Sequence, residues 1–163
     1  PAKRHNYLLK VYQCLLKREY MDFAVEKYAE LGATEIVPVI SDRSLSDLKD
    51  KTIRRYKDIS LKAVLQSENE QLPVIQDPVD LSEIIADADE NILFYEREEG
   101  GECITPAKDM SIVIGPEGGF TDDEYNMIVS KGFKAVKPIN QILKAETASA
   151  VFTGYVRILQ EQM

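Results

Sequence analysis

Apolar residues along the chain form two kinds of pattern that alternate with each other. Continuous apolar runs of strand length predict β-strands at residues 7–16, 35–40, 72–76, 91–95, 111–114 and 133–136. Stripes at helical spacing predict helices at residues 21–31, 53–64, 81–85, 121–132 and 148–159. Because apolar strands alternate with helices, we expect an α/β fold with a mostly parallel sheet and helices on both faces. Ligands in such folds bind at the carboxyl ends of the strands.

Local signals mark several element boundaries. Gly32 follows the first helical stripe, where a helix C-terminus favours glycine. Thr121 and Glu124 form a capping box, which predicts a helix start directly after a glycine-rich segment. Pro38 cannot donate a ladder hydrogen bond, so its strand is either an edge strand or one with interrupted pairing. Residues 96–102 are polar and predict a solvated turn.

The composition limits the class of protein. The 163 residues suit one domain, residues 1–163, and a formal net charge of −8 disfavours nonspecific binding to nucleic acid. An RNA ligand would therefore need a local basic surface or a second segment. Two cysteines without a CxxC pair suit a reducing cytoplasm and predict no metal site. The sequence contains no apolar run of membrane-spanning length, and its start resembles a cut at a domain junction.

The segment GPEGG, residues 115–119, joins an apolar strand to the capped helix. It is either a tight turn or a loop whose missing side chains let a ligand reach backbone N–H groups. Neither the Walker pattern nor the dinucleotide fingerprint fits its glycine spacing. Glu117 would repel phosphate by about 1 kcal/mol at 4 Å even in water, and it would attract a cation such as a sulfonium.

A second unusual segment, residues 139–152, reads INQILKAETASAVF. Its small residues would let a helix start pack closely on another backbone. It is either an ordinary amphipathic helix or the second wall of a crevice shared with the glycine loop.

IGPEGGF followed by ILKAETA resembles the RsmE family, S-adenosylmethionine-dependent methyltransferases of the SPOUT class that modify a uridine base nitrogen in small-subunit ribosomal RNA. The segments MDFAVEKYAELGATEIVPVISDRS and KAVLQSENEQLPVI resemble further motifs of that family in the same order. The resemblance implies a C-terminal trefoil knot, an obligate homodimer and a cytoplasmic enzyme without a metal. It also implies that an RNA-binding PUA-like barrel normally precedes this domain, and we expect that barrel to be absent here.

The resemblance also implies which residues form the site. Those implied to hold the cofactor are Leu93, Phe94, Tyr95, Ile114, Gly115, Pro116, Glu117, Gly118, Gly119, Ile139, Gln141, Ile142, Leu143 and Ala145. Those implied to contact RNA are Arg43, Ser44, Arg97 and Lys144. Lys144, Glu117 and Thr147 are the candidates for catalysis. Glu146 lies near them in sequence, and capping or loop roles stay open for Glu117, Glu146 and Thr147.

This chain departs from the family pattern at three positions that usually hold arginine. Gln141 and Lys144 replace two of them, and Glu68-Asn69-Glu70 follows the Gln-Ser pair where the third is common. Lysine cannot form the bidentate contacts of arginine, so RNA contacts are the part of the function most affected. A catalytically inert SPOUT-like module for dimerisation or RNA docking is the alternative.

Overall fold

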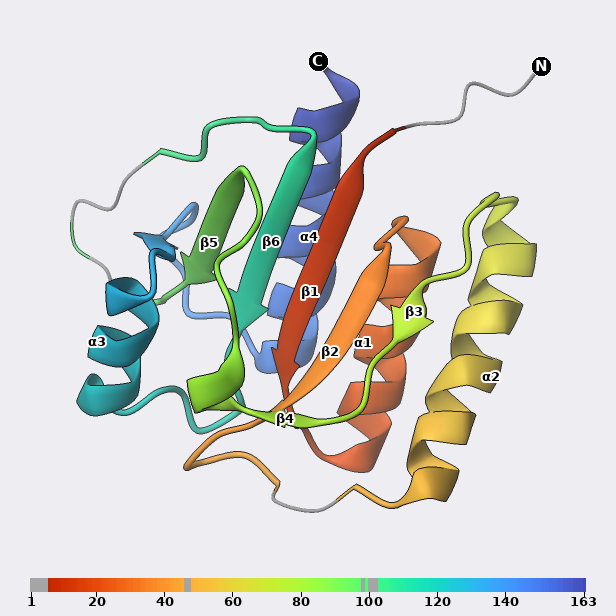
Figure 1. The fold of residues 1–163 in the computed structure, drawn as a ribbon, viewed down its shortest axis with the longest axis horizontal. Helices are drawn as coiled ribbons and strands as arrows, with labels where there is room; N and C mark the ends of the chain where they lie inside the picture. The colour runs from red at the N-terminus through yellow and green to blue at the C-terminus, as the bar shows by residue number, and fades with distance from the viewer. Residues whose placement is uncertain (1–5, 46–47, 98, 100–102) are drawn as a thin grey trace.

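The structure, a computed structural model, describes residues 6–45, 48–97, 99 and 103–163. Seven parallel strands form one sheet in the order β3-β2-β1-β6-β5-β7, with β4 also paired to β2 (Figure 1). The strands are β1 (Leu8–Cys14), β2 (Glu35–Ile40), β3 (Val74–Ile75), β4 (Val79–Asp80), β5 (Glu90–Phe94), β6 (Asp109–Ile114) and β7 (Lys134–Val136). The helices are α1 (Arg18–Glu30), α2 (Asp50–Ser67), α3 (Asp122–Ser130) and α4 (Ala145–Glu161), with a 3-10 turn at Leu81–Glu83.

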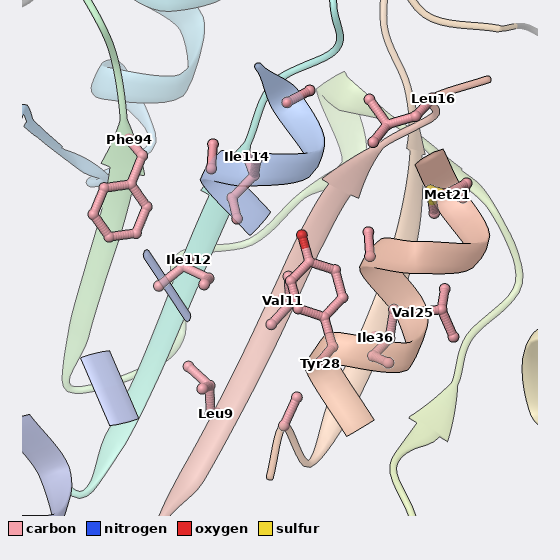
Figure 2. Packing of buried hydrophobic residues seen from close by; sticks show 14 of the residues in the cluster. Leu9, Val11, Leu16, Met21, Val25, Tyr28, Ile36, Phe94, Ile112 and Ile114 are labelled. Carbon is pink, nitrogen blue, oxygen red and sulfur yellow. The ribbon is translucent and has the colours of Figure 1, made fainter. Parts of the chain in front are cut away.

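Side-chain alternation along the strands divides the core between the two faces of the sheet. Leu9 and Val11 of β1 point to the face covered by α1 and α4, where Tyr28 is also buried (Figure 2). Tyr12 of β1 points to the other face and packs with Ile128 of α3. Helices therefore cover both faces, and the predicted α/β architecture is confirmed, while the trefoil knot stays a prediction.

The proline in β2 interrupts the neighbouring strand. β2 is not an edge strand, because it pairs with β1 on one side and with β3 and β4 on the other. The carbonyl of Ile36 accepts from the N–H of Gln76, and Pro38, two residues further on, faces the same side. Its missing N–H falls between the pairing of β3 with Glu35 and Ile36 and that of β4 with Val39 and Ile40. Of the two alternatives, interrupted pairing is correct.

Three expectations for the elements differ from the structure. The run at 72–76 contributes only two paired residues, and β4 was not expected at all. The predicted helix at 81–85 is a single 3-10 turn, which Asp80 and Glu83 cap. The turn expected at 96–102 lies partly outside the described residues. Among the helices described, none is long and apolar enough to cross a membrane.

Candidate functional site

A pocket of about 500 Å³ opens at the carboxyl ends of β5, β6 and β7. The loops that follow these strands and the first turns of α1 and α4 form its walls. The residues that line it are Lys17, Tyr20, Phe94, Tyr95, Glu96, Arg97, Ile114, Gly115, Pro116, Glu117, Gly119, Phe120, Val136, Lys137, Pro138, Ile139, Gln141, Ile142, Leu143, Lys144, Ala145, Glu146, Ala148 and Phe152. Such a volume lies within the range of about 300–1,000 Å³ that small-molecule sites occupy.

The glycine loop turns sharply where β6 ends. Gly119 has φ +73°, a left-handed conformation that favours glycine, and its N–H donates to the carbonyl of Pro116 at 2.9 Å. A Cβ at Gly115 would come within 2.9 Å of the Phe120 ring, so the backbone and this ring are in close contact. Both Gly115 and Phe120 line the pocket, and that close contact therefore shapes its wall.

Gly118 faces away from the pocket lining and contacts Arg43. The Arg43 Nη1 donates to the carbonyl oxygen of Gly118 at 3.1 Å, and a Cβ on Gly118 would lie 3.1 Å from that of Arg43. The glycine at this position therefore allows the loop after β2 to pack on the glycine loop.

A buried carboxylate joins the same two loops. Glu124, which is 7% exposed, accepts from the backbone N–H of Thr121 at 2.9 Å through Oε1, as the capping box predicts. Its Oε2 accepts from the backbone N–H of Asp42 at 3.0 Å, in the loop that carries Arg43. Glu124 thus fixes the start of α3 and the loop after β2 relative to each other.

The first turn of α4 closes the pocket from the side of residues 137–144. Ala145, Ala148 and Phe152 follow the i, i+3, i+7 spacing and face the pocket, and Phe152 stacks on Phe94 with ring centroids 4.2 Å apart. Buried Ser149 contacts the hydroxyl of Tyr28, which donates to Gln13 in β1. Burial raises the pKa of Tyr28, so this side chain stays a neutral hydrogen-bonding group that anchors the start of α4.

Charges of both signs surround the pocket. Three carboxylates line it, from Glu96, Glu117 and Glu146, together with four cations, from Lys17, Arg97, Lys137 and Lys144. Glu117 and Lys144 are both exposed. The charge of Glu117 alone therefore does not decide whether the ligand is an anion or a cation. The prediction of a cationic ligand from Glu117 is incomplete.

The pocket brings together most of the residues predicted for the site. It includes Phe94, Tyr95, Arg97, Ile114–Glu117, Gly119, Ile139 and 141–145. Five predicted residues lie outside the lining: Leu93, Gly118, Thr147, Arg43 and Ser44. Leu93 points to the opposite face of the sheet, Thr147 is exposed on α4, and Ser44 bonds within its own loop.

Ten lining residues are not among the predicted site residues: Lys17, Tyr20, Glu96, Phe120, Val136, Lys137, Pro138, Glu146, Ala148 and Phe152. Of these, only Glu146 was considered from the sequence, with a capping role left open. The sequence contains features that could have identified some of them, because Phe120 adjoins the glycine loop and Ala148 shares a helical phase with Ala145. Lys17 and Tyr20 have no such feature, since they enter from the segment after β1. In the described part of the chain, no three His, Cys, Asp or Glu side chains group so as to hold a metal ion.

The third altered arginine position lies away from the pocket. Glu68 ends α2 with φ 56°, and the amide of Asn69 donates to the carbonyl of Ala29 at 3.1 Å, near the C-terminus of α1. That end of α1 faces the amino ends of the strands (Figure 1). Within this chain, only Gln141 and Lys144 among the altered positions line the pocket.

The sheet and the pocket together define an α/β domain with a pocket of small-molecule size where its parallel strands end. The chain belongs to the RNA methyltransferase domain family, whose sequence profile matches residues 3–157. It is 38% identical over 133 residues to ribosomal RNA small subunit methyltransferase E of Aquifex aeolicus, an alignment of 78% of this chain and 58% of that protein. The protein of the same name from Buchnera aphidicola is 31% identical over 148 residues, covering 85% of this chain and 58% of the relative.

A solved structure agrees in fold. Ribosomal RNA small subunit methyltransferase E from Neisseria gonorrhoeae, bound to S-adenosylmethionine, superposes with a TM-score of 0.84 at 26% identity. The match covers 94% of this chain and 66% of that one. These findings confirm the resemblance to the RsmE family. The chain spans somewhat more than half the length of the curated relatives it matches.

Proposed function

We propose that this chain is an S-adenosylmethionine-dependent methyltransferase that acts on a uridine base nitrogen of small-subunit ribosomal RNA. The observation that carries the proposal is the single pocket wall formed by the glycine loop and residues 137–145. These are the two segments that resemble RsmE motifs. The names of the relatives and the ligand of the Neisseria gonorrhoeae protein support the same reaction and cofactor.

The residues of the pocket fit S-adenosylmethionine. Aromatic and aliphatic side chains such as Phe94, Val136 and Leu143 offer apolar walls to an adenine ring. Gly119 lines the pocket without a side chain, and the nearest atom to the position of a Cβ there is Oε1 of Glu96 at 4.0 Å. Glu96, Glu117 and Glu146 supply negative charge that stabilises a sulfonium. When bound, the cofactor supplies an activated methyl group for an in-line displacement.

The chain itself would position the base and stabilise its charge. A uridine imide nitrogen must lose its proton before it can attack, and the negative charge then spreads to the base carbonyl oxygens. Lys144 and Lys17, both on the pocket wall, are the cations we assign to those oxygens. Glu117 lines the pocket and is our candidate for accepting the proton, whereas Thr147 is exposed outside it.

The direct test is methyl transfer from tritiated cofactor to small ribosomal subunits, with calorimetry on the same protein. We expect micromolar binding of S-adenosylmethionine and incorporation at a uridine of the small-subunit RNA. Binding without incorporation on any RNA would favour the inert module, and incorporation at another base would reject the assignment to uridine.

Restoring an arginine tests the link between the pocket and RNA. Gln141 is exposed on the pocket wall, so Gln141→Arg should leave folding intact and raise the rate of methyl transfer by adding a bidentate phosphate contact. Gln162→Arg is the matched control, because Gln162 is exposed at the far end of α4. An equal gain in both variants would show a nonspecific effect of charge.

A homodimer is the assembly we propose, with α4 at its interface. Val151, Tyr155 and Ile158 form an apolar stripe on α4 and are 42%, 40% and 57% exposed. Such a stripe on the helix that starts at the pocket suits a second copy of the chain. Sedimentation should give a dimer that Ile158→Glu converts to monomer, and a monomeric wild-type chain would reject the interface. We assign the reaction to the cytoplasm, where bacteria such as the organisms of these relatives assemble their ribosomal subunits.

A further inference from the structure

Charge is distributed unevenly along this acidic chain. Residues 49–67, which comprise α2 and the lysine before it, contain six cations and two acids. The following residues, 68–102, contain twelve acids and one cation. Residues 68–102 therefore carry a larger negative charge than the −8 of the whole chain, and α2 is a local concentration of positive charge.

The cations of α2 point to solvent. One face of the helix is buried through Ile53, Tyr56, Ser60, Ala63 and Val64. Lys51, Arg54, Lys57 and Lys62 are exposed on the other side, with Asp58 as the acid among them. Arg55 is used internally, because its Nε donates to Asp22 of α1 at 3.0 Å. The exposed cations are therefore free to face a partner while the helix is held by its apolar side.

The N-terminal end of α2 lies at the end of the sheet that carries the pocket. The Arg55–Asp22 ion pair fixes the early turns of α2 beside the first turns of α1, directly after Lys17 on the pocket wall. Figure 1 shows the N-terminal ends of α1 and α2 beside the carboxyl ends of the strands. The loop after β2, whose Arg43 bonds the glycine loop, leaves the same end of the sheet (Figure 1). Exposed cations are thus present at the pocket, at Arg43 and on the early turns of α2, all at this end of the sheet.

We propose that the exposed face of α2, formed by Lys51, Arg54, Lys57 and Lys62, is a docking surface for the phosphodiester backbone of the RNA substrate. This inference rests on the proposed function and adds a second contact region outside the pocket. A polyanion fits because the cations are spaced along one helix face, whereas the acidic segment that follows would repel the strand and orient it. The face supplies position and affinity, and the pocket selects the base.

The experiment compares two variants of equal charge change in this chain. Lys51→Ala with Arg54→Ala removes two cations of the docking face, and alanine preserves the helix. Lys108→Ala with Lys131→Ala removes two cations from the segment before β6 and the end of α3. Binding to protein-free small-subunit ribosomal RNA is measured across a salt series, and binding of S-adenosylmethionine is measured by calorimetry.

If the docking face binds RNA, the affinity for RNA should depend less steeply on salt in the Lys51→Ala, Arg54→Ala variant and not in the control variant. Two lost phosphate contacts reduce the slope of log K against log salt by about 1.4 to 1.8. The KM for RNA should rise while kcat and cofactor affinity stay at wild-type values. An unchanged slope, or an equal loss in the control variant, would overturn the docking face. If the wild-type chain transfers no methyl group but the two variants still differ in slope, the proposed reaction is rejected and the docking face is retained.

Discussion

Replacing Gly115 with alanine tests the geometry of the pocket wall. The new Cβ would lie 2.9 Å from Cε2 of Phe120 and 3.3 Å from two further ring atoms. Phe120 is only 5% exposed and packs in the core cluster with Ile128 and Phe133, so the ring cannot simply turn into solvent. Either the ring or the strand end must move, and both line the pocket.

The size of the effect follows from the contact. Overpacking a filled core costs about 1–3 kcal/mol. For a chain of this length, each kcal/mol lowers the melting temperature by about 2–4 °C, so Gly115→Ala should lose about 2–12 °C. Cofactor affinity should fall as well, because the displaced ring forms part of the wall.

Thermal unfolding and calorimetry with S-adenosylmethionine measure both effects. Gly154→Ala in α4 is the control, since its Cβ would meet only Cδ1 of Leu31 at 3.9 Å, an ordinary van der Waals contact, and Gly154 does not line the pocket. The decisive variant is Gly115→Ala combined with Phe120→Leu, compared with Phe120→Leu alone. If contact with the Phe120 ring causes the destabilisation, Gly115→Ala lowers the melting temperature less when Phe120 is replaced by leucine. The same cost in both backgrounds, or a wild-type melting temperature in Gly115→Ala, would refute the reasoning.

Three further predictions concern the buried carboxylate of Glu124 and the two cysteines. Glu124→Gln leaves one backbone N–H without an acceptor and should cost about 1–3 kcal/mol, with faster amide exchange at Asp42 as the sign that the loop is released; slow exchange there would show that the contact is dispensable. Burial raises the pKa of Cys14 to about 12, so the folded chain keeps a neutral thiol while the unfolded chain ionises above about pH 9. The stability that this difference contributes is complete below pH 9 and is lost as pH rises toward 12, and Cys14→Ala should flatten that decline in a denaturation series. At pH 8, iodoacetamide should modify exposed Cys103 in the native chain and reach Cys14 only after unfolding, and labelling of both in the native state would contradict the buried position.

The sequence predicted the strands and helices well because each has a strong period of its own. It did not give the strand order, since pairing β1 with β6 joins residues a hundred positions apart. Lys17 shows the consequence, because nothing in its local sequence marks it as a site residue. It reaches the pocket only because β1 lies beside β6 in the sheet.

Some differences could have been resolved from periodicity. Thr147 was chosen for its place in the Ala-Glu-Thr-Ala motif, but helical phase separates it from Ala145 and Ala148, which face the pocket. The role of Gly118 needed coordinates, because a glycine that admits a ligand and one that admits a neighbouring arginine look alike in sequence. The side of β2 on which Pro38 lacks its N–H also depends on the register of the sheet.

The pocket combines segments that are far apart in the sequence, so a chain that is still being synthesised cannot complete it until α4 has been made. Lys17 leaves the ribosome long before Phe152, and the side chain of Gln160 in α4 donates to the carbonyl of Leu8 in β1. Until α4 emerges, a newly made chain exposes the apolar surface of β6 and α1 that this helix covers. Chains that terminate prematurely near residue 145 should therefore be recognised by chaperones and proteases as unfinished, however well their glycine loop has formed.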